Sequence, residues 1–182
     1  MTLQELLDTL PNYSKDFRLN LPGLLQQSEL TPQQAWGTLV ASAFASRNAE
    51  LLRTVIQEAA PHINEQVIEA AKAAAAIMGM NNIFYRFQHL IEKEKYSEMP
   101  SRLRMQALRN HGVDQTDFEL WCTAVSAING CGKCLVAHER VVLEKGISED
   151  TVLAAVRIAS VVHGLAVVLD AETALKTQPA TA

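Results

Sequence analysis

The sequence has few cysteines, few aromatic residues and no cluster of basic residues. Its 182 residues include three cysteines and 5% aromatics, and 16 Lys and Arg residues stand against 20 acidic residues, for a net charge of −4. The basic residues are scattered, so the chain has no positively charged patch of the kind that binds nucleic acid or an anionic membrane surface. We therefore expect neither nucleic acid nor membrane among its partners.

The sequence also lacks a long uninterrupted apolar run. No stretch reaches the roughly 18 consecutive apolar residues of a membrane helix. The N-terminal MTLQELLDTLPNY places acidic residues among its apolar ones and has no basic start followed by an apolar segment, so no signal peptide is visible. These absences predict a soluble, intracellular protein of the cytoplasm.

Alternating strand-like runs, hairpin turns between them and a Gly-rich phosphate loop are absent as well. Apolar residues instead recur at spacings of three and four, and 48% of the residues are hydrophobic, enough for the core of one compact domain. We expect an all-α single domain over residues 1–182. The expected helices are 3–10, 32–46 (Thr31 as cap, with a Thr-x-x-Gln capping box), 48–60, 64–82 with a helical continuation, a short one within 100–112, 116–128 opened by Thr116, 131–145, and a last one capped by Ser148.

Two halves of the sequence resemble each other. Trp36 and the segment after it align with Trp121 and its segment, and Ile63 aligns with Ile147. This similarity predicts two repeated helical units, at about residues 31–82 and 116–175. In this alignment the first unit has Gln34, Ser46, Ala49 and Arg53 where the second has Glu119, Cys131, Cys134 and His138. The comparison indicates that only the second unit carries chemistry.

The segment NGCGKCLVAH contains the candidate site. Cys131 and Cys134 form a Cys-x-x-Cys pair at the expected start of a helix, where unpaired backbone N–H groups favour a thiolate. Lys133 adds a positive charge between them, and His138 follows Cys134 by one helical turn, in range to exchange a proton. If the preceding helix returns antiparallel, Glu119 approaches His138. A carboxylate, an imidazole and a thiol in series would activate a nucleophile.

Other interpretations of these residues remain open. The two cysteines and His138 could be part of a zinc site, although no second Cys or His pair completes it, or they could simply pack. Thr116 and Glu119 form a possible capping box, in which Glu119 would bond a backbone N–H. Lys133 could be an ordinary solvated side chain, and Cys122 a small core residue. Covalent haem attachment is excluded because Leu135, not His, follows Cys134.

The segment FELWCTAVSAINGCGKCLVAHERVV, together with WGTLVASAFASRN, AAIMGMNNIFYRF and LPNYSKDFRLNL, closely resembles the alkyl hydroperoxidase D (AhpD) family of the carboxymuconolactone decarboxylase-like superfamily. The similarity spans nearly the whole chain. It implies an all-α fold with a duplicated unit and a homo-oligomer, usually a trimer. It also implies an antioxidant enzyme that reduces the peroxiredoxin AhpC and, weakly, organic hydroperoxides.

In this family the dithiol needs no bound cofactor or metal and takes electrons from dihydrolipoamide on a dihydrolipoyl-bearing protein. The resemblance implies that Cys134 reacts with the hydroperoxide and Cys131 resolves it into a disulfide, with Glu119 and His138 as the proton relay. Lys133 departs from the family pattern, which has His between the cysteines. Two alternatives remain: a carboxymuconolactone decarboxylase-like enzyme that does not need the cysteines, and a zinc-stabilised redox-sensing interaction protein.

Overall fold

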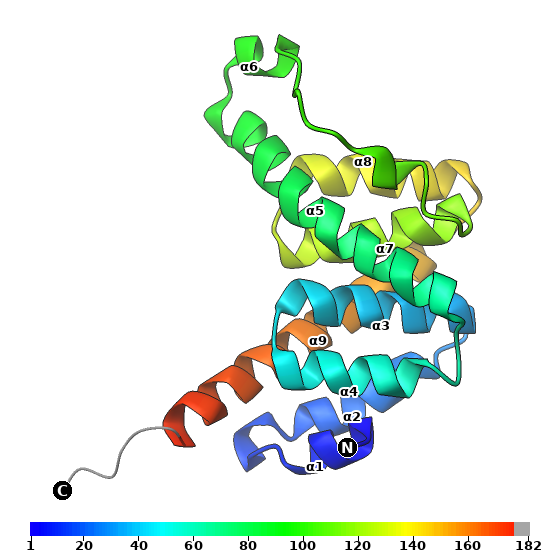
Figure 1. Cartoon of the computed structure of the whole chain (residues 1–182), viewed down its shortest axis with the longest axis vertical. Coiled ribbons are helices and arrows are strands. Elements are labelled where there is room, and N and C mark those ends of the chain that lie inside the picture. Colours follow the sequence, from blue (N-terminus) through cyan, green and yellow to red (C-terminus); the bar gives the residue numbers. More distant parts are fainter. Residues whose placement is uncertain (177–182) are drawn as a thin grey trace, which may run out of the picture.

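The protein is all-helical. The computed structural model describes residues 1–176, and within that range it contains helices and turns but no strand (Figure 1). The α-helices are α1 (Leu3–Asp8), α2 (Asp16–Leu25), α3 (Pro32–Ser46), α4 (Ala49–Ala59), α5 (Glu65–Ile91), α6 (Glu94–Glu98), α7 (Gln115–Ile128), α8 (Gly132–Glu144) and α9 (Glu149–Lys176), with 3-10 turns η1 (Asn12–Ser14) and η2 (Gln106–Leu108). The prediction of an all-α fold is confirmed.

Side-chain caps set most of the helix starts. Thr31 and Gln34 form both hydrogen bonds of the predicted capping box at the start of α3, with Pro32 in the first turn. Asn48 caps α4 and Ser148 accepts from the backbone N–H of Thr151 at the start of α9. These local signals confirm the predicted starts of α3, α4 and α9.

Two of the predicted boundaries are wrong. The helix that carries Glu119 begins at Gln115 with Asp114 as its cap, because the Asp114 carboxylate accepts from the backbone N–H groups of Thr116 and Asp117. Thr116 therefore lies inside the helix rather than before it. Residues 100–112 form only the short turn η2 instead of a helix. Helix α6 stops before Pro100, which favours the extended conformation of Met99 (φ −72°, ψ 135°).

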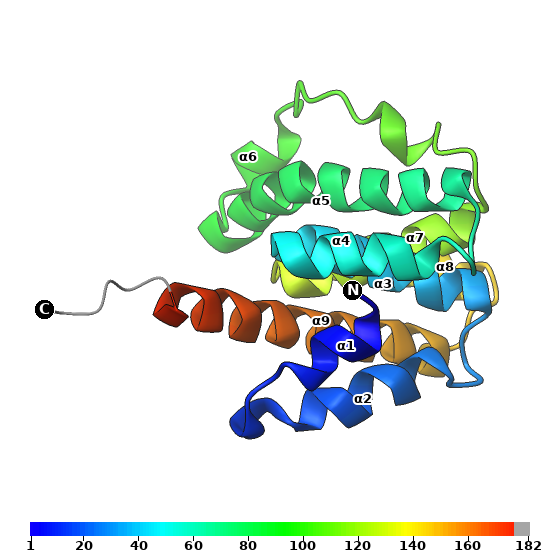
Figure 2. The ribbon, with the colours of Figure 1, turned by 60° about the horizontal axis from the view of Figure 1, so that its bottom comes forward.

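Helix α3 lies at the centre of the fold. It packs against α5, α7 and α9, while α1 and α2 cover one end of the molecule (Figure 2). Helix α3 contacts α7 at Gly37, where a Cβ atom would lie 2.3 Å from the indole ring of the fully buried Trp121. Only glycine leaves room for the ring there, so Gly37 allows the Trp121 side chain of α7 to pack directly against the backbone of α3.

Helix α9 is long and apolar enough to cross a membrane by length and composition alone, although Arg157 and His163 interrupt its apolar residues. Half of its most apolar 18-residue stretch is buried inside the structure, where α9 packs against α2, α3 and α7. Core helices of soluble proteins have the same length and composition. In this structure the apolar residues of α9 supply a large part of the core.

The helix order is the same in the two predicted units. Helices α3, α4 and α5 have 15, 11 and 27 residues, and α7, α8 and α9 have 14, 13 and 28. In each predicted unit two shorter helices are thus followed by one long helix. The turn between α7 and α8 carries the Cys-x-x-Cys motif.

Candidate active site

A tight turn presents the first cysteine. Helix α7 ends at Ile128, and Gly130 follows with φ +66°, a left-handed conformation that glycine adopts without strain. The backbone N–H of Cys131 then donates to the carbonyl of Ser126 at 3.1 Å. Cys131 thereby becomes the N-cap of α8, at the positive end of that helix.

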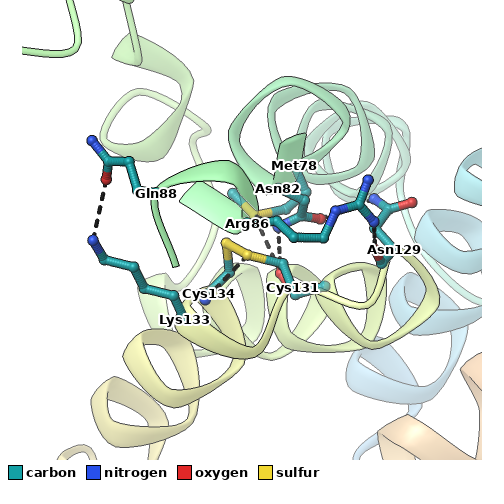
Figure 3. The surroundings of a disulfide bond; sticks show 9 residues. Met78, Asn82, Arg86, Gln88, Asn129, Cys131, Lys133 and Cys134 are labelled. Atoms are coloured by element: carbon teal, nitrogen blue, oxygen red, sulfur yellow. Dashed lines mark hydrogen bonds between the residues drawn. A yellow bond between two sulfur atoms is a disulfide. The ribbon is translucent and has the colours of Figure 1, made fainter. Parts of the chain in front are cut away.

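Cys131 and Cys134 are joined by a disulfide, with their Cα atoms 5.3 Å apart (Figure 3). The backbone N–H of Cys134 points to the Cys131 sulfur at 3.3 Å. In the reduced protein this first-turn N–H would favour a thiolate on Cys131. Cys131 is fully buried, whereas Cys134 retains 5% exposure, so Cys134 is the more accessible of the two to a small reagent.

Glu119 and His138 form a close pair between α7 and α8. The Glu119 Oε2 atom lies 2.5 Å from Nδ1 of His138, and the side chains are 11% and 14% exposed. The other carboxylate oxygen, Oε1, accepts a hydrogen bond from Gln115 Nε2 at 2.8 Å. Both oxygens of Glu119 thus have side-chain partners, and the capping-box interpretation of Glu119 is wrong because Asp114 performs that role.

The pair is connected to the cysteines through α8. His138 lies four residues after Cys134 in the same α-helix, so the two side chains share one face, one turn apart. A side chain in a helix leans toward the N-terminus, which brings the His138 ring toward Cys134. The structure therefore brings Glu119 to His138 and places His138 on the cysteine-bearing face of α8.

Lys133 is directed away from the sulfur atoms. Its ammonium group donates to Gln88 Oε1 on α5 at 3.1 Å (Figure 3). It also lies 5.6 Å from the centre of the ring of Tyr85, another residue of α5. This contact pins the first turn of α8 to α5. The Lys133 charge is thus held on the α5 side of the motif rather than between the two thiols.

Residues of α5 support the motif turn. Asn82 donates to Ser126 Oγ at 2.9 Å and accepts from the Asn129 side chain at 2.9 Å. Arg86, one turn further along α5, donates to the Asn129 carbonyl at 2.5 Å (Figure 3). The signal in the sequence was the spacing of Met78, Asn82 and Arg86, which places all three on one helix face.

Cys122 is separate from the dithiol. It is fully buried in α7 and unpaired, and burial raises the pKa of its thiol well above the usual range, with the charge of Glu119 adding to the rise. It therefore stays a neutral thiol in the core, as predicted. Among residues 1–176, no three or more His, Cys, Asp or Glu side chains are grouped so that they could hold a metal ion.

Comparison with known proteins identifies close relatives. The model of the carboxymuconolactone decarboxylase family matches residues 94–177. A protein of Solibacter usitatus named alkyl hydroperoxide reductase AhpD is 61% identical over 94% of this chain and 97% of its own length. Proteins of the same name from Acidobacterium capsulatum and Rhodospirillum centenum are 57% and 50% identical, covering 100% and 98% of this chain and 100% and 96% of their own lengths.

Proposed function

Because the chain belongs to the AhpD family, within the carboxymuconolactone decarboxylase-like superfamily, we propose that it is a peroxide-reducing thiol oxidoreductase. The observation that carries the proposal is the arrangement of α8, in which the Cys131–Cys134 pair begins the helix and His138, held by Glu119, follows one turn later. The names of the relatives support the same activity. The site works as a dithiol without a bound cofactor or metal.

The first step is attack of the Cys134 thiolate on a hydroperoxide oxygen. His138 takes the thiol proton, and Glu119 stabilises the imidazolium that results. The O–O bond breaks, the alkoxide leaves as an alcohol after protonation, and Cys134 becomes a sulfenic acid. Cys134 suits this role because it is the more exposed of the two cysteines.

The second step closes the disulfide. The Cys131 thiolate, favoured by the N–H of Cys134, attacks the Cys134 sulfur and expels hydroxide, which leaves as water. A dithiol donor then returns two electrons by thiol–disulfide exchange and is itself oxidised to a disulfide. We propose dihydrolipoamide on a dihydrolipoyl-bearing protein as this donor.

The same dithiol can serve a protein substrate. In that branch a thiolate of the reduced pair attacks the disulfide of the oxidised peroxiredoxin AhpC, and the second thiol resolves the mixed disulfide, so that AhpC is reduced and Cys131 and Cys134 are oxidised. We propose AhpC as the main partner and direct reduction of organic hydroperoxides as the weaker activity, both in the cytoplasm.

We further propose a homo-oligomer, with a trimer expected. The second half of α5 exposes Ile83 (64%), Phe87 (46%) and Leu90 (71%), which follow one another at helical spacing and form an apolar stripe. A stripe of this kind is stabilised by contact with another subunit. Sedimentation equilibrium of the wild type and of Phe87→Glu tests it, since the variant should shift to a smaller species.

One experiment tests the reaction. The reduced protein is mixed with one equivalent of an organic hydroperoxide, and thiols and disulfides are mapped by mass spectrometry in the wild type and in Cys134→Ser. Rapid formation of the Cys131–Cys134 disulfide, absent in the variant and reversed by dihydrolipoamide, is the expected result. Unreacted thiols in the wild type would contradict direct peroxide reduction and leave only disulfide exchange with AhpC to be assayed.

A further inference from the structure

A line of polar side chains continues from Glu119 away from the cysteines. Gln115 Nε2 donates to Glu119 Oε1 at 2.8 Å, and Gln115 Oε1 lies 2.9 Å from Nε2 of His111. The other ring nitrogen of His111, Nδ1, accepts from the backbone N–H of Val113 at 3.3 Å. The line therefore runs from a backbone N–H through His111, Gln115 and Glu119 to His138.

The direction of the hydrogen bonds between Val113 and Glu119 follows from the first member of this line. A backbone N–H is always a donor, so Nδ1 of His111 is the acceptor, and the proton of the neutral ring is on Nε2. His111 Nε2 then donates to Gln115, which must present its carbonyl oxygen to His111 and its NH₂ group to Glu119. Gln115 Nε2 also donates to the Leu108 carbonyl at 3.5 Å, and a backbone carbonyl can only accept, so His111 and Leu108 fix the same orientation of the Gln115 amide.

The position of the proton on His138 follows if Glu119 is a carboxylate. A carboxylate that accepts from Gln115 at Oε1 also accepts at Oε2, and the group opposite Oε2 is Nδ1 of His138. His138 must then carry its proton on Nδ1, which leaves the lone pair of Nε2 free to take a proton from Cys134.

We propose that Gln115 and His111 are positioning residues, which fix the orientation of the Glu119 side chain, aim its Oε2 atom at Nδ1 of His138 and thereby hold His138 in the Nδ1–H tautomer that can act as a base toward Cys134. This inference rests on the proposed function only for the final proton transfer. His111 is itself held, since its ring stacks on the buried Phe118 with ring centres 4.1 Å apart and planes 11° apart. Neither residue touches the reacting atoms.

Two variants interrupt this line of hydrogen bonds while Glu119 and His138 themselves stay unchanged. Gln115→Met keeps the length of the side chain but removes its amide, and His111→Phe keeps a ring to stack on Phe118 but removes the donor. Gln66→Leu is the matched control, because Gln66 donates to the Gly112 carbonyl at 2.7 Å and so holds the same loop from outside the line. The reduced full-length proteins are compared in two measurements.

The first measurement is the tautomer of His138, read from its ¹⁵N chemical shifts by NMR. The wild type and Gln66→Leu should carry the proton on Nδ1, and Gln115→Met and His111→Phe should show a mixture of tautomers. The second is the pH profile of the reaction of Cys134 with a hydroperoxide. We expect the rate at neutral pH to fall about tenfold in Gln115→Met, a part of what a general base contributes, and about threefold in His111→Phe, the effect of losing one hydrogen bond.

A wild-type His138 with its proton on Nε2, or tautomers and pH profiles unchanged in both variants, would overturn the proposal while leaving peroxide reduction intact. A protein that does not react with hydroperoxide but shows the predicted tautomers would retain the positioning role and contradict only the proposed function. If Gln115→Met does not fold, His111→Phe decides the outcome by the same two measurements.

Discussion

Cys131, Lys133 and Cys134 are close in sequence but have different surroundings in the structure. Cys131 accepts from the N–H of Cys134, whereas Cys134 shares its helix face with His138. In the reaction we propose, each thiol would therefore have its own source of activation, the helix start for Cys131 and the imidazole for Cys134. Lys133, between them, contacts Gln88 on α5 instead.

Glu119→Gln should lower the rate of disulfide formation by hydroperoxide about 10- to 100-fold, because an amide cannot stabilise the imidazolium of His138 as a carboxylate does. Stopped-flow mixing of the reduced protein with hydroperoxide measures this rate. Asp117→Asn is the control, since Asp117 is equally buried on α7 but accepts only from Gln33 and Gln34. Equal losses of rate in the two variants would mean that any buried carboxylate change on α7 impairs the reaction, and that Glu119 has no specific role.

At the scale of elements, the start of α7 and the turn into α8 position the site. Asp114 caps α7 and Gly130 reverses the chain, so Glu119 and His138 face each other from adjacent helices. Burial acts to raise the pKa of Asp114, but hydrogen bonds from Thr116 and Asp117 and the charge of Lys145 outweigh it, and the net shift is downward. The charged form of Asp114 is therefore favoured in the folded protein.

Asp114→Ala should lower the free energy of unfolding by about 1 kcal/mol at pH 7, the usual cost of losing a helix cap. Asp114→Asn keeps an acceptor and should cost less. Because the pKa is lower in the folded state, the contribution of the charge is present above the pKa of the unfolded chain and is lost as the pH falls through the pKa of the folded state. Urea unfolding of the three proteins from pH 7 to pH 3 should show the gap between wild type and Asp114→Asn closing in acid, and a gap that stays constant would refute the assignment.

At the scale of the whole molecule, the packing of α3 against α7 joins the two predicted units. Gly37 leaves space for Trp121, and the ring fills the space between α3 and the helix that carries Glu119. The position of the site thus depends on a contact between residues more than 80 positions apart in the chain. Dense cores respond strongly to a single added methyl group at such a contact.

Gly37→Ala should lower the free energy of unfolding by about 1–3 kcal/mol, because the new Cβ atom would lie 2.3 Å from the Trp121 ring. Gly79→Ala is a suitable comparison, since no atom lies within 4 Å of a Cβ placed there in α5. It should be stabilising by about 0.5–1 kcal/mol. Denaturant midpoints of both variants measure the effects, and a Gly37→Ala protein as stable as the wild type would show that α3 and α7 can move apart without cost.

Short-range patterns in the sequence determined the helical class, most helix boundaries and the identity of the dithiol. Thr31 with Gln34, Asn48 and Ser148 act within three residues, and Cys131, Cys134 and His138 lie on one helix, so local spacing was sufficient to predict them. The start at Thr116 was predicted wrongly because two acceptors, Thr116 and Asp114, compete there, and local spacing does not decide between them.

Only the tertiary structure decided which distant side chains meet. Lys133 is 45 residues from Gln88, and nothing local predicted that contact. The approach of Glu119 to His138, 19 residues apart, was expected from the sequence only on the condition that the two helices are antiparallel. Such contacts depend on how helices cross, which is set by packing at sites such as Gly37 and Trp121 rather than by the residues that make the contact. The contacts of Gln115 with Glu119 and of His111 with Gln115 each span four residues, but they join the site only through the contact of Glu119 with His138, which requires α7 and α8 to be packed together.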